Sequence, residues 1–131
     1  MISGALAGKF KDDLLKDFKF IPHELKVAAI LDGEFISKAE SQIKGSGYCV
    51  ASLEASLWCF FNTESFEAAV LRAANLGDDV DTTAAITGQI AGAYYGAAAI
   101  RADWVEKLSM REEIEEMANQ LYKRFYPGLT S

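Results

Sequence analysis

Three carboxylates and two hydroxyls crowd into six consecutive residues, Asp78-Asp79-Val80-Asp81-Thr82-Thr83. Like charges this close repel one another, and a bound cation relieves the repulsion. Asp79, Asp81 and Thr82 offer only oxygen atoms, which suit a hard divalent ion such as Mg²⁺, Mn²⁺ or Ca²⁺ better than zinc. This acidic turn, defined here as residues 77–83, is therefore a candidate metal site.

A purely structural role explains the same residues. Asp and Thr are favoured helix N-caps, and acids near a helix N-terminus are stabilised by its free amides and by the helix dipole. Such caps are far commoner than metal sites, so the residues alone leave both explanations open. A calcium EF-hand fits poorly, because a loop counted from Asp79 would need Gly and Glu where the chain has Ala84 and Ile90.

Length, composition and charge narrow the class of protein. The 131 residues are about one domain long, half of them are hydrophobic, and the net charge is −6. An acidic chain without a basic stripe is a poor candidate for nucleic-acid binding. No segment at the start has the zones of a secretory signal, so we expect a cytoplasmic protein.

The two cysteines, Cys49 and Cys59, fall on one predicted helix. Ten residues at a rise of ~1.5 Å hold them about 15 Å apart, too far for a disulfide. We expect both to be buried, reduced thiols.

Apolar residues recur at helical spacing along most of the chain, and no strand pattern is evident. Residues 9–20 are predicted to be an amphipathic helix or a connector, and residues 35–47 are polar. The last helix carries an apolar stripe of Ile114, Met117, Ala118, Leu121 and Phe125. The remaining helices are predicted at 23–31, 48–61, 66–74, 82–100 and 102–108. The sequence thus predicts an all-α helical bundle, with residues 1–131 as a single segment.

The helix after the acidic turn has no charged residue from Thr82 to Ile100, so a membrane span must be considered. The segment is rich in Ala and Gly, contains Gln89 and several threonines, and is only weakly hydrophobic. Gly88, Gly92 and Gly96 recur every four residues, which favours close approach of a neighbouring helix. We therefore predict a buried central helix, with no membrane involvement.

Four segments together resemble the C-terminal part of the ADP-ribosylglycohydrolase family. The resemblance runs over nearly the whole chain, and the combination is specific although no single motif is. The segments are 45–58 (GSGYCVASLEASLW), 62–70 (NTESFEAAV), 75–86 (NLGDDVDTTAAI) and 88–96 (GQIAGAYYG).

The resemblance implies a compact all-α fold that holds two Mg²⁺ or Mn²⁺ ions in a cleft for ADP-ribose. It implies hydrolysis of the bond between the anomeric carbon of ADP-ribose and its acceptor, so the expected partner is an ADP-ribose-containing substrate. By the same resemblance, Asp79, Asp81 and Thr82 are metal ligands, and Gly47 and Tyr48 lie near the nucleotide. Asp78 stands where many family members have Gly, and it is not assigned as a ligand.

One departure from the family limits these expectations. Family members are about twice as long, and their N-terminal half carries further metal ligands and an acid thought to assist catalysis. Residues 1–45 reproduce none of those motifs, so no catalytic residue is assigned. We expect the chain to be inactive alone, and to form a homo-oligomer or pair with a complementing N-terminal chain. The alternative is a non-catalytic helical module that self-associates or binds a partner.

Overall fold

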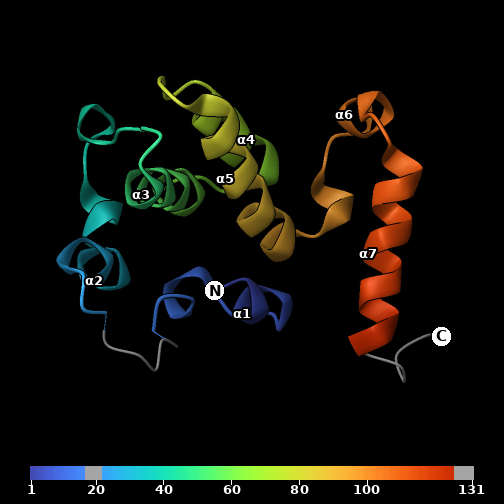
Figure 1. Ribbon diagram of the computed structural model, residues 1–131, viewed down its shortest axis with the longest axis horizontal. Coiled ribbons are helices and arrows are strands. Elements are labelled where there is room, and N and C mark those ends of the chain that lie inside the picture. Colours follow the sequence, from blue (N-terminus) through green and yellow to red (C-terminus); the bar gives the residue numbers. More distant parts are fainter. Residues whose placement is uncertain (17–21, 126–131) are drawn as a thin grey trace. The chain divides into compact units, whose positions relative to one another are not determined.

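A computed structural model describes residues 1–16 and 22–125, which form helices and short turns without any strand (Figure 1). This confirms the all-α class. The chain divides into two compact units, residues 1–100 and residues 101–131.

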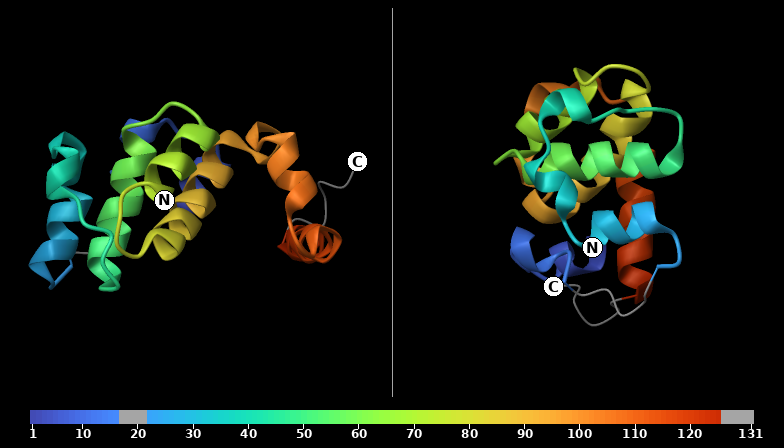
Figure 2. Two further views of the ribbon diagram at one scale, coloured as in Figure 1. Left: turned by 90° about the horizontal axis from the view of Figure 1, so that it is seen from above. Right: turned by 90° about the vertical axis from the view of Figure 1, so that its left-hand side faces the viewer.

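Three helices form the centre of the first unit. They are α3 (Cys49–Phe61), α4 (Phe66–Ala74) and α5 (Val80–Tyr95), and each packs against the other two (Figures 1 and 2). α4 begins as predicted, because the Ser65 side chain accepts a hydrogen bond from the Ala68 amide at 3.1 Å. Buried apolar side chains form the core between them. Its fully buried members include Ala55, Leu57, Phe60, Ala69, Ala73 and Ala91.

Two glycines of the α5 stripe, Gly88 and Gly92, face α4, but at ordinary van der Waals distance rather than by an unusually close approach. A Cβ atom on Gly88 would lie 4.0 Å from Val70, and one on Gly92 would lie 3.8 Å from Phe66, so α4 approaches α5 at both glycines. Gly96 is not in the helix: it follows Tyr95 with φ 81° and stops α5 before the expected end. In the part of the chain described here, no helix has both the length and the apolar character needed to cross a membrane.

The first sixteen residues are a connector rather than a long helix. α1 (Ile2–Leu6) packs against α5, and a single 3₁₀ turn, η1 (Lys11–Asp13), follows. The Lys11 ammonium donates to the Phe60 carbonyl at 2.9 Å and to the Thr63 carbonyl, and it lies 4.6 Å from the centre of the Phe60 ring. Burial lowers the pKa of Lys11, partly offset by Glu64. Residues 17–20 of the predicted helix lie outside the described residues.

The polar stretch before α3 contributes to the core, which its composition did not indicate. After α2 (Leu25–Leu31) come two 3₁₀ turns, η2 (Glu34–Ser37) and η3 (Glu40–Gln42). Phe35 is fully buried and Ile43 nearly so. The Trp58 indole donates to the Lys38 carbonyl at 3.0 Å and ties this stretch to α3.

The second unit contains α6 (Ala102–Lys107) and α7 (Arg111–Phe125). The predicted apolar stripe of α7 is present, but it is not buried as a core stripe would be. Ile114, Met117 and Leu121 are 42%, 57% and 59% exposed.

The cysteines correct one prediction. Both are free and both lie on α3, as expected, but only Cys59 is buried, whereas Cys49 is exposed. Cys49 is the first residue of the helix, and the buried face of α3 begins only at Ser52. Burial raises the pKa of the Cys59 thiol to about 11.

Candidate functional site

The acidic turn joins α4 to α5 through two consecutive residues with positive φ. Gly77 has φ 91° and Asp78 has φ 58°. The Val80 amide then donates to the Asp78 carbonyl at 3.0 Å. Asp tolerates the left-handed region better than most residues, and glycine adopts it freely. This backbone places Asp79 at the N-cap of α5.

At Asp79, the structure argues against a capping role of the side chain. Asp79 occupies the N-cap position, yet its side chain makes no capping hydrogen bond. Asp81 bonds locally, because its Oδ1 accepts from the Thr82 amide at 3.0 Å. Asp79 is partly buried, while Asp81 and Thr82 are exposed. Helix capping therefore does not account for the Asp79 carboxylate.

Two of the three carboxyl groups of the turn, those of Asp79 and Asp81, lie within reach of each other. The hydrogen bond from the Thr82 amide lowers the pKa of Asp81, and the neighbouring Asp79 side chain acts in the same direction. Two acids this close favour a cation, and their oxygens with the Thr82 hydroxyl match the donors that Mg²⁺ or Mn²⁺ prefers. Among residues 1–16 and 22–125, however, no three His, Cys, Asp or Glu side chains are grouped to hold a metal. The turn thus fits one side of a cation site.

A ladder of buried hydroxyl groups supports the turn and was not predicted from the sequence. The Thr83 hydroxyl donates to the Asp79 carbonyl at 2.8 Å, and the Thr87 hydroxyl donates to the Thr83 carbonyl at 2.8 Å. From α3, the Ser56 hydroxyl donates to the Ser52 carbonyl at 2.7 Å and to the Thr83 carbonyl at 3.1 Å. The only signal in the sequence is a pair of hydroxyl residues four apart in each helix.

The loop before α3 lies against the acidic turn. The Asp79 amide donates to the Gly45 carbonyl at 2.7 Å, and the Ser52 hydroxyl holds the Ser46 carbonyl at 2.6 Å. A Cβ atom on Gly47 would lie 3.9 Å from Asp79 Oδ2. The fold therefore brings Gly47 to the candidate metal ligands from a position more than thirty residues away in the sequence.

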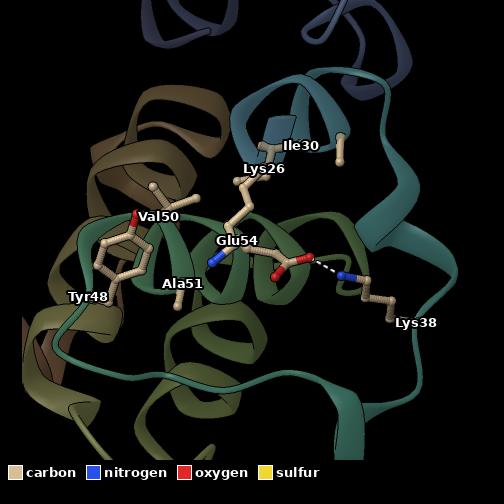
Figure 3. Close-up of a pocket in the computed structure, with 8 residues that line it drawn as sticks. Lys26, Ile30, Lys38, Tyr48, Val50, Ala51 and Glu54 are labelled. Atoms are coloured by element: carbon tan, nitrogen blue, oxygen red, sulfur yellow. Dashed lines mark hydrogen bonds and ion pairs between the residues drawn. The ribbon is translucent and has the colours of Figure 1, made fainter. Parts of the chain in front are cut away.

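Tyr48 faces a pocket of about 260 Å³ between α2 and α3 (Figure 3). The Lys26 ammonium lies 5.3 Å from the centre of the Tyr48 ring. On the other side, the Glu54 carboxylate pairs with the Lys38 ammonium. The pocket is lined by Lys26, Ala29, Ile30, Lys38, Tyr48, Val50, Ala51 and Glu54.

Comparisons with known proteins agree with the fold and the motifs. A family model described as ADP-ribosylglycohydrolase matches residues 1–129. The chain belongs to the ADP-ribosylglycohydrolase family.

Individual relatives support this assignment. An ADP-ribosylarginine hydrolase of Serratia proteamaculans is 46% identical over 102 residues, which cover 78% of this chain and 28% of that protein. An ADP-ribosyl-[dinitrogen reductase] glycohydrolase of Rhodospirillum rubrum is 38% identical over 72 residues, covering 55% and 24%. A solved structure, an ADP-ribosylglycohydrolase-related protein complex, superposes with a TM-score of 0.84 at 38% identity, covering 93% of this chain and 43% of that one. The matches therefore span about a quarter of each of the two curated relatives.

Proposed function

We propose that this chain forms the C-terminal portion of a Mg²⁺- or Mn²⁺-dependent ADP-ribosylglycohydrolase. The reaction is hydrolysis of the bond between the anomeric carbon of ADP-ribose and its acceptor. The observation that carries the proposal is the Asp79 carboxylate, which caps no helix and lies beside both Asp81 and the Gly47 loop. The names of the relatives, which are hydrolases of ADP-ribosylated substrates, support the substrate class.

In this proposal Asp79, Asp81 and Thr82 hold one side of a two-ion site. When bound, the ions orient the ribose and help to position the water that attacks the anomeric carbon. Gly47 and Tyr48 contact the nucleotide. The remaining metal ligands and the acid that transfers the proton come from polypeptide outside residues 1–131, so the chain alone turns over little or no substrate.

Electrostatics makes ADP-ribose binding dependent on the cation. ADP-ribose carries a negatively charged diphosphate, and the acidic turn brings further negative charge beside the Gly47 loop. Without a cation, these like charges repel each other across a short distance. A divalent cation held by Asp79, Asp81 and Thr82 would offset this repulsion.

Calorimetric titration of ADP-ribose into the chain, with and without Mg²⁺, tests the proposal. We expect binding only with Mg²⁺, weakened at least tenfold by Asp79→Asn, which removes the charge at nearly constant volume. Asp32→Asn, at an exposed carboxylate after α2, is the matched control and should bind as the wild type does.

Three outcomes would contradict parts of the proposal. Equal binding without metal, or by Asp79→Asn, would remove the metal role of the turn. No binding under any condition would leave the turn with a structural role. Strong release of ADP-ribose from ADP-ribosylarginine by the isolated chain would contradict its inactivity alone.

The exposed stripe of α7 favours a second candidate function, a non-catalytic module that associates through this helix. Acids occupy the first half of α7 and Lys123 and Arg124 its last turn, so antiparallel pairing with another copy places opposite charges side by side. A complementing N-terminal chain is the other candidate partner. Native mass spectrometry across a range of concentrations distinguishes them, since a monomer throughout argues against self-association.

A further inference from the structure

Neighbouring threonines in the acidic turn have opposite environments. Thr82 is exposed and free to face a ligand, whereas Thr83 is fully buried with 0% of its surface exposed. The Thr83 hydroxyl donates to the Asp79 carbonyl at 2.8 Å, and the Thr83 amide donates to the same oxygen at 3.1 Å. Thr83 is therefore closed to solvent in this arrangement, and its hydroxyl acts on the Asp79 backbone.

Asp79 is held on both sides of its Cα atom. Its carbonyl accepts the two bonds from Thr83, and its amide donates to the Gly45 carbonyl at 2.7 Å. Gly45 fits closely here, because a Cβ atom would lie 3.0 Å from the Thr83 hydroxyl oxygen and 3.3 Å from the Gly77 carbonyl oxygen. With both peptide groups fixed, only the side-chain torsions of Asp79 remain free to turn its carboxylate.

The hydroxyl ladder connects this point to two helices. Ser56 of α3 and Thr87 of α5 both donate to the Thr83 carbonyl, at 3.1 Å and 2.8 Å, and both are fully buried. A valine has nearly the volume of a threonine, so packing alone would not require a hydroxyl at position 83. What the threonine adds is the directed bond to Asp79.

We propose that Thr83 is a positioning residue for the candidate metal site: its hydroxyl fixes the Asp79 backbone and thereby directs the Asp79 carboxylate towards Asp81 and the Gly47 loop. The metal part of this inference rests on the proposed function, whereas the effect on the Asp79 backbone does not. A Thr83 that only stabilised the fold would affect all parts of the first unit equally.

Hydrogen exchange of backbone amides, measured by NMR on the whole chain, tests the effect on the backbone. The measured quantity is a ratio of exchange rates. The rate of the Asp79 amide is divided by the mean rate of the Ile90 and Ala91 amides, which lie within α5. We expect Thr83→Val to raise this ratio about tenfold, because the turn then opens locally more often than the helix does.

Two variants serve as controls for this ratio. Thr83→Ser keeps a hydroxyl and should restore the wild-type ratio. Thr87→Val removes an equally buried hydroxyl of the same ladder, one turn further from Asp79, and should leave the ratio unchanged. An unchanged ratio in Thr83→Val, or an equal rise in Thr87→Val, overturns the inference.

A second pair of variants and a measurement of Mn²⁺ affinity complete the test. If Thr83→Val does not fold, Thr83→Ala is compared with Thr83→Ser, from which it differs only by the hydroxyl; its ratio should be about tenfold higher, and an equal ratio overturns the inference. Mn²⁺ affinity measured by electron paramagnetic resonance should fall about tenfold in Thr83→Val and recover in Thr83→Ser; equal affinity overturns the metal part. Absence of Mn²⁺ binding by the wild type contradicts the proposed function instead, and the exchange ratio still decides the role of Thr83.

Discussion

Replacing Gly45 by alanine tests the contact between the loop before α3 and the acidic turn. Gly45 is buried, and its backbone is not in the left-handed region, so alanine strains no torsion there. The added methyl group would lie 3.0 Å from the Thr83 hydroxyl oxygen and 3.3 Å from the Gly77 carbonyl oxygen. Neither atom moves away easily, since the first belongs to the hydroxyl ladder and the second to the main chain.

The expected magnitude is the difference between two opposing effects. Overpacking of a closely fitted site costs about 1–3 kcal/mol. Alanine also restricts the unfolded chain, which returns about 0.4–1 kcal/mol. The free energy of unfolding should therefore fall by about 1–2 kcal/mol, which corresponds to a decrease of roughly 4–8 °C in Tm for a chain of this length.

Gly47→Ala is the matched control, two residues along the same loop. Its methyl group would lie 3.9 Å from Asp79 Oδ2, an ordinary van der Waals contact, and the residue is exposed. We expect no loss of stability, and a gain of up to about 1 kcal/mol from the unfolded state. Both variants are compared by urea denaturation followed by Trp58 fluorescence, in a Trp104→Phe background. Equal stability of the two variants would refute the close contact at Gly45.

Four further predictions concern the cysteines, the turn and the N-terminal connector. Iodoacetamide should modify Cys49 in the native protein and spare Cys59, whose burial raises its pKa to about 11, as mass spectrometry of tryptic peptides would show. The folded state keeps the Cys59 thiol protonated above the ordinary pKa near 9, so the free energy of unfolding should be level below pH 9 and fall towards pH 11. Urea denaturation at pH 8 and pH 10 measures this decrease, which should be smaller in Cys59→Ala. Asp78→Gly should change stability by less than about 0.5 kcal/mol, whereas Asp78→Val should cost about 1–2 kcal/mol because its φ is 58°; equal effects would contradict the backbone conformation. Lys11→Met should lower stability by about 1 kcal/mol in thermal unfolding, since two main-chain carbonyls lose their donor, whereas Lys16→Met at an exposed site should have little effect.

The helices were predictable from the sequence where an apolar face repeats every three to four residues. The pattern of residues 66–74 matches α4, whose start is capped by Ser65 in the structure. The end of α5 was not predictable from periodicity, because the alanine-rich run continues past Tyr95 and only the backbone of Gly96 stops the helix. Phe35 and Ile43 were missed because isolated apolar residues in a polar stretch show no period.

The candidate site was predictable in its residue types but not in its construction. Three acids in four residues identify the turn, yet the sequence cannot show whether Asp79 caps α5, which depends on where its carboxylate points. Hydroxyl residues are equally ambiguous, because serine and threonine serve on the surface and in buried networks alike. Only the packing of α3 against α5 turns Ser56 and Thr83 into a connected ladder.

The hydrogen bond between the Asp79 amide and the Gly45 carbonyl couples the acidic turn to the loop before α3. It joins the turn that carries the proposed metal ligands to the loop that carries Gly47, so ordering one segment also orders the other. If a metal ion orders the turn, the loop loses part of its freedom before a nucleotide arrives, and the nucleotide binds at a lower cost in conformational entropy. Linkage then requires ADP-ribose to raise the affinity for Mn²⁺ by the same factor as Mn²⁺ raises the affinity for ADP-ribose. Any direct effect of the ion's charge on the nucleotide would persist in Gly45→Ala, which leaves every proposed ligand in place, so only the part transmitted through the backbone should change there.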